Sequence, residues 1–105
     1  MLLGLSSNSK EDSNKKISIT RLVFDVVKPH KPDIVELSEA IAKLNGVKRV
    51  DIDVKDYDSN IERLRLVTVG DSLDLEIIKK TIKEYGGNVA SLDGVSTLGE
   101  SEEEK

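Results

Sequence analysis

Charged side chains recur at odd-numbered positions of three β-prone segments, where they could act together. A β-strand points alternate side chains to opposite faces, so such positions would share one face of a sheet. The set comprises Arg21, Asp25, Asp51, Asp53, Arg63 and Arg65. Opposite charges on neighbouring strands form stabilising pairs, and arginines can bind an anionic small molecule.

Three interpretations of this face remain open. It could be a salt-bridged surface in solvent, or a pocket in which Arg21, Arg63 and Arg65 bind an anion. It could also be a contact between subunits, because several aliphatic residues share its parity and would otherwise sit in water. These aliphatic residues are Ile19, Val23, Val27, Val67 and Val69.

A proline-bracketed corner follows the first segment and contains His30, the sole histidine. A zinc site needs three or four donors, and the chain offers neither a second histidine nor any cysteine. We therefore expect His30 to act in packing or capping. An enzyme that uses the Lys28–His30 corner with Arg21 or Asp25 is the alternative, although alternation places Asp25 and Lys28 on opposite faces.

Oxygen-bearing side chains alternate at Asp56, Asp58 and Asn60, which resembles the start of a calcium-binding loop. Ile61 stands where such a loop requires glycine, and Val67 stands where it requires glutamate. The segment is thus expected to be a hairpin turn. A divalent cation such as calcium would need further carboxylates from a neighbouring subunit.

The segments that position these residues follow from periodicity. Strands are predicted over 17–28, 47–57, 61–69 and 88–95, with amphipathic helices over 34–44 and 75–85. Asp33 and Asp74 are the expected N-caps, and glycines follow both helices. The order β-α-β-β-α-β predicts a ferredoxin-like α+β fold, with both helices on one face of a four-stranded antiparallel sheet and the other face open.

Composition limits the function classes. Residues 1–16 are expected to be a disordered lead-in, 17–98 the domain, and 99–105 an acidic tail. The net charge of −4 and the lack of stacking aromatics on the open face argue against nucleic acid as a partner. No apolar run is long enough for a membrane span, and we expect a cytoplasmic protein.

The segment LVFDVVKPHKPDIVELSEAI, together with the ending SLDGV, resembles a small archaeal family of uncharacterised proteins, domain of unknown function 211. The resemblance covers roughly residues 17–98, and DVVKPH is its most specific part. It implies a ferredoxin-like fold and a homo-oligomer, ring-like in form. It implies no activity. The expected function is therefore a homo-oligomeric module that binds a small ligand or divalent cation at subunit junctions.

Overall fold

The protein is described by a computed structural model over residues 15–101. The predictions for residues 1–14 and 102–105 concern residues outside this range. The elements, in chain order, are β1 (Lys15–Pro29), α2 (Ile34–Ala42), β2 (Val47–Tyr57), β3 (Ile61–Gly70), α3 (Leu75–Glu84) and β4 (Asn88–Ser101).

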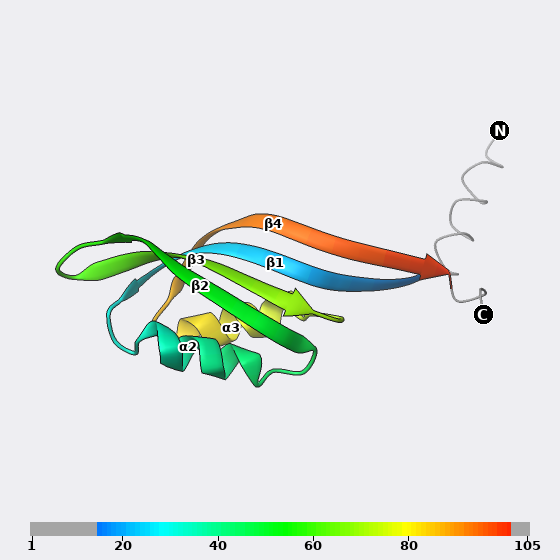
Figure 1. Cartoon of the computed structure of the whole chain (residues 1–105), viewed down its shortest axis with the longest axis horizontal. Helices are drawn as coiled ribbons and strands as arrows, with labels where there is room; N and C mark the ends of the chain where they lie inside the picture. The colour runs from blue at the N-terminus through cyan, green and yellow to red at the C-terminus, as the bar shows by residue number, and fades with distance from the viewer. Residues whose placement is uncertain (1–14, 102–105) are drawn as a thin grey trace.

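The four strands form one antiparallel sheet in the order β2-β3-β1-β4, which confirms the ferredoxin-like arrangement. β1 and β3 are its central strands, and β2 and β4 are its edges. Both helices lie against the same face, as Figure 1 shows, so the opposite face carries no helix. Right-handed crossovers between strands and helices produce this one-sided arrangement.

The core lies between the sheet and the two helices. Leu22, Phe24 and Val26 of β1 point into it, as predicted, together with Leu64 and Leu66 of β3. Each helix adds two buried aliphatic residues that lie four positions apart, Leu37 and Ile41 in α2 and Ile78 and Ile82 in α3.

The helix boundaries follow their caps. Asp33 accepts a hydrogen bond from the Glu36 amide (2.9 Å), and Glu36 accepts one from the Asp33 amide (3.0 Å), which is a complete capping box. Asp74 accepts from the Ile77 amide (3.1 Å) at the start of α3. Gly46 and Gly86 take positive φ angles of 87° and 88° after the helices, a conformation that glycine adopts without steric cost.

The structure corrects two expectations about the open face. A register shift between Ile19 and Arg21 leaves Thr20 as an extra residue of β1, and Ile19 packs against the core. Strict alternation had placed Ile19 on the open face. Val23 and Val67 do lie opposite the helices, but neighbouring side chains bury both of them instead of leaving them in water.

The last strand is longer than its sequence suggests. β4 continues to Ser101, whereas we expected it to end at Val95. Register shifts beside Asp93 and Ala90 absorb the residues that interrupt the pattern, so the strand bends without ending. β3 pairs with β1 only from Arg21 onward. The start of β1 and the end of β4 therefore extend past the sheet as a two-stranded arm, visible in Figure 1.

Candidate functional site

Lys28 is the most deeply buried charged residue that the structure describes, with 1% of its surface exposed. It follows Phe24 and Val26 on the core-facing parity of β1. Its Nζ donates to the carbonyl oxygens of Pro29 (2.7 Å) and Pro32 and to Glu62 Oε2 (3.3 Å). An ammonium group has three hydrogens, so all of them have acceptors. No donor capacity is left for a substrate.

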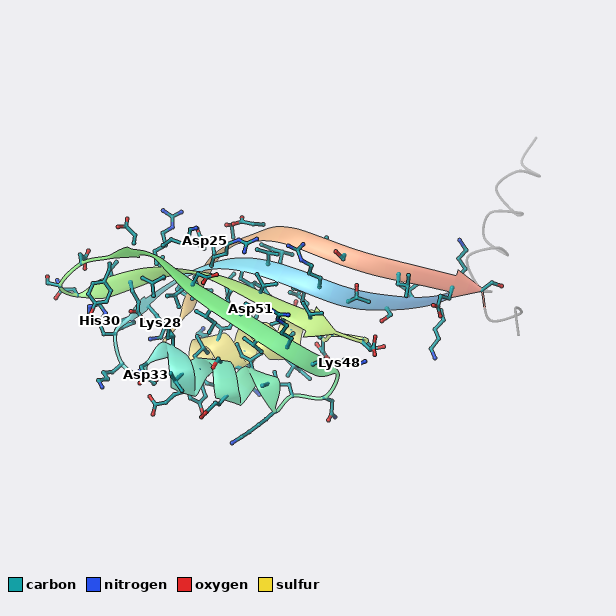
Figure 2. The ribbon with its side chains drawn as sticks, viewed as in Figure 1. Asp25, Lys28, His30, Asp33, Lys48 and Asp51 are labelled. Carbon is teal, nitrogen blue, oxygen red and sulfur yellow. The ribbon has the colours of Figure 1, made fainter. Side chains whose placement is uncertain are left out.

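Glu62 connects this lysine to His30. Its Oε1 lies 3.4 Å from His30 Nδ1, and its side chain is almost completely buried at the start of β3. His30 Nε2 lies 2.9 Å from the Asp58 carbonyl oxygen, which can only accept, so this nitrogen carries a proton in the bond. The imidazole stacks on Tyr57 with 4.3 Å between ring centroids. Figure 2 shows His30 beside the β2–β3 hairpin.

These contacts connect the Lys28–His30 corner to the β2–β3 hairpin. The chain of contacts runs from Lys28 through Glu62 and His30 to Asp58. Lys28, Glu62 and His30 contact one another and the backbone, whereas Asp58 also lines a hollow beside the hairpin. The geometry agrees with the packing role expected for His30.

Asp25 lies on the opposite face of the sheet, away from the helices, as Figure 2 shows. Arg63 binds it with two hydrogen bonds, Nε to Oδ1 at 3.0 Å and Nη2 to Oδ2 at 2.8 Å. These hydrogen bonds hold the pKa of Asp25 below its usual range and raise the pKa of Arg63. This part of the open face is a bidentate ion pair.

The other charged residues of the open face are less connected. Arg49 donates to Asp51 at 3.0 Å across one residue of β2. Arg65 lies between Asp53 and Asp25 in the strand register, yet Asp25 pairs with Arg63 instead. Within residues 15–101, Arg21, Arg65 and Asp53 form no ion pair or side-chain hydrogen bond. Unpaired arginines on this face are open to an external carboxylate.

The predicted cation residues lie at the end of β2, where Asp56 stands, and in the turn that follows, which contains Asp58 and Asn60. Asp58 Oδ1 accepts hydrogen bonds from the amides of Asn60 and Ile61, both at 2.8 Å. These amides lower the pKa of Asp58, with a smaller contribution from His30. Asp56 accepts from the Tyr57 amide (3.2 Å). The loop therefore has the hydrogen bonds of an ordinary Asx turn, as the sequence predicts.

Two neighbouring hollows border the Asp25–Arg63 pair. One, of about 340 Å³, reaches the hairpin and contains Asp56, Tyr57 and Asp58. The other, of about 270 Å³, is lined by Lys55, Arg65 and Asp93. No group of three or more histidine, aspartate or glutamate side chains is placed to hold a metal ion in the part of the chain described. A cation here would need donors from outside this subunit.

Sequence reasoning missed Glu62 and Tyr57 as partners of the corner. A signal for Glu62 was present, since it shares the even-numbered parity of Leu64 and Leu66 and so points toward the core. A carboxylate at such a position requires a buried cation. The contact with Tyr57 depends on the path of the corner, which the periodicity of the strands does not specify.

The fold and the site define a small ferredoxin-like module. Its main polar contacts join side chains of the same chain, Lys28 with Glu62 and Arg63 with Asp25. Residues 20–103 match the family model DUF211, described as "Uncharacterized ArCR". An uncharacterized protein of Methanocaldococcus jannaschii, MJ0319, is 32% identical over 77 residues, which cover 73% of this chain and 79% of that protein. The chain belongs to the DUF211 family. None of the helices described is both long and apolar enough to cross a membrane.

Proposed function

We propose that this chain is a self-associating module that acts by assembly, and that it binds a small ligand or divalent cation where subunits meet. The observation that carries the proposal is the exposure of β4 and its arm. Ile17, Val95 and Leu98 are 61%, 55% and 49% exposed. A long strand edge with exposed aliphatic side chains favours association with another chain.

The corner supports a binding role over an enzymatic one. Lys28 donates to the Pro32 carbonyl oxygen and to Glu62, and His30 contacts the Asp58 carbonyl oxygen. These bonds stabilise the hairpin next to the open face. The hollow beside them is lined by Asp25, Asp56 and Asp58, with Arg63 as counter-charge. A second subunit that adds carboxylates would complete a hard-cation site of oxygen donors.

The solution mass tests the assembly directly. Light scattering on the full chain across a hundredfold range of concentration should give at least twice the monomer mass of 11.6 kDa. A mass of 11.6 kDa throughout that range contradicts the proposal.

A thermal-shift screen tests the ligand. A compound that binds only the folded assembly raises its melting temperature by mass action. Calcium, magnesium, manganese and a panel of anionic metabolites are compared on the native chain and on Asp56→Asn. A shift in the native chain that the variant loses supports the hairpin hollow. No shift with any compound contradicts ligand binding and leaves assembly standing.

A further inference from the structure

A part of the open face away from the hairpin gathers arginines around an apolar floor. We call it the arginine hollow; its volume is about 460 Å³, and Val67 and Val69 of β3 form its floor. The charged side chains that line it are Arg21, Arg49, Arg65, Asp51 and Asp53. Asp51, labelled in Figure 2, marks its β2 side. Three arginines against two aspartates leave positive charge in excess, although the whole chain has a net charge of −4.

The strand register explains why these arginines surround one hollow. Val69 pairs with Arg49 of β2 on one side and with Arg21 of β1 on the other. Arg65 lies four residues before Val69 on the same face of β3, which places it about 13 Å away along the strand. Val67 stands between them. Arginines therefore flank a short strip of valines at both of its ends.

Arg21 and Arg65 have free guanidinium groups. Neither forms an ion pair or a side-chain hydrogen bond within residues 15–101. Arg21 Nη1 lies 3.7 Å from the point where a Cβ on Gly94 would stand, and Gly94 pairs with Val23, two residues further along β1. The Arg21 side chain thus runs along the sheet toward the row that contains Arg65, and the absence of a side chain on Gly94 gives it room.

This arrangement favours a ligand with two anionic ends over a compact anion. A guanidinium group binds a carboxylate through two parallel N–H donors, and here two such groups approach from opposite ends of the hollow. A compact anion such as phosphate is typically bound by free backbone amides that converge on one point. The backbone beneath the arginine hollow is instead paired in the ladders of β3 with β1 and β2. The valines between the arginines suit a short hydrocarbon chain.

We propose that the arginine hollow binds a small dicarboxylate, with one carboxylate on Arg21, the other on Arg65 and the hydrocarbon chain over Val67. The sequence had suggested Arg63 as a third arginine of such a pocket, but Arg63 is bound to Asp25. Arg49 lines the hollow in its place and adds positive charge. The site needs side chains of one subunit only, so it goes beyond the proposed function and does not depend on assembly.

Isothermal titration calorimetry on the full chain tests the ligand class. Succinate, glutarate and adipate are each compared with the monocarboxylate of the same chain length, and inorganic phosphate is titrated alongside. The tightest dicarboxylate should bind at least tenfold more tightly than its monocarboxylate and more tightly than phosphate, because only it engages both arginines. Equal affinities for the two members of every pair, tighter binding of phosphate, or no binding of any dicarboxylate would each overturn the proposal.

Substitution of each arginine tests the site. Arg21→Gln and Arg65→Gln should each weaken binding of the dicarboxylate about tenfold, as expected for loss of a hydrogen bond between charged groups. Lys79→Gln is the matched control, because it removes one exposed positive charge from α3, on the other side of the sheet. Its affinity should equal that of the native chain. Equal weakening in all three variants, or native affinity in both arginine variants with native-like circular dichroism, would overturn the site.

The same titrations separate this site from the hairpin hollow of the proposed function. Dicarboxylate binding that is lost in Asp56→Asn and kept in Arg65→Gln would place the ligand at the hairpin, so the proposed function would stand and this inference would fall. The reverse pattern supports the arginine hollow. If light scattering finds the native chain monomeric while dicarboxylate binding depends on Arg21 and Arg65, the proposed assembly falls and this inference stands.

Discussion

At the scale of single residues, the buried Lys28–Glu62 pair is the clearest case of polar groups that depend on each other. Removal of one partner from a buried pair leaves an uncompensated charge in the interior. Glu62→Ala should therefore lower the free energy of unfolding by about 3 kcal/mol. Urea denaturation measures this loss. Glu62→Gln, which keeps a hydrogen-bond acceptor, should lose less, and equal losses would show that charge is unimportant here.

Thr68, unlike Lys28 and Glu62, is a buried polar residue whose side chain has no partner among the described residues. Its hydroxyl is buried among the core residues of β3 and has no hydrogen-bond partner within the described residues. A buried polar group without a partner costs free energy that an apolar isostere avoids. Thr68→Val should raise the free energy of unfolding by about 1 kcal/mol, again measured with urea. A clear loss of stability would mean that the hydroxyl has a partner in solution.

At the scale of elements, the β2–β3 hairpin should respond to acid through Asp58. Its pKa is lowered in the folded chain because the amides of Asn60 and Ile61 donate to the carboxylate. A lowered folded pKa contributes stability above the ordinary carboxyl pKa of about 4, and this is lost as the pH falls through the folded value. The native chain should therefore lose stability as the pH falls below about 4.

The hairpin variant isolates that contribution. Asp58→Ala should melt earlier than the native chain at pH 7, and the difference should shrink toward pH 2. Melting temperatures measured by circular dichroism at each pH provide the comparison. Asp53→Ala, an exposed aspartate of β2 without a described partner, is the control. A constant difference between native chain and Asp58→Ala at every pH would contradict the assignment.

Sequence reasoning recovered the elements because each carries its own local signal. The Asp33 and Asp74 caps, the aliphatic helix stripes and the parity of Phe24 all depend on neighbours in the chain. What it missed was the bulge at Thr20 and the continuation of β4 to Ser101. Both depend on how β1 and β4 pair across a long sequence separation, and no local pattern encodes that register.

At the site too, contacts between sequence neighbours could be predicted, whereas contacts between distant segments could not. The Asx turn at Asp58 could be predicted from its own sequence. The contacts of His30 with Glu62 and Tyr57 join segments some thirty residues apart and required the fold. Likewise, the partner of Asp25 could not be chosen from sequence, since Arg63 binds it diagonally although Arg65 is directly opposite.

At the scale of the whole molecule, the exposed aliphatic side chains indicate where a second copy would bind. The open face buries Val23 and Val67 by itself, whereas β4 and its arm leave aliphatic side chains exposed. We therefore expect association at the edge of the sheet more than at its face. Leu98→Lys should dissociate the assembly, because a charge would replace an apolar side chain where β4 meets another chain, while the melting temperature of the subunit changes little. Light scattering of this variant at the monomer mass is the expected result.

Amide hydrogen exchange along β4, measured at high and low protein concentration, tests directly whether this strand pairs with another chain. An unpaired edge strand leaves every second amide open to water, whereas a strand paired on both sides protects them all. We expect all amides from Val95 to Glu100 to exchange slowly at high concentration, and alternate amides to become fast on dilution or in Leu98→Lys. Rapid exchange of alternate amides at every concentration would contradict the pairing of β4 with a second copy.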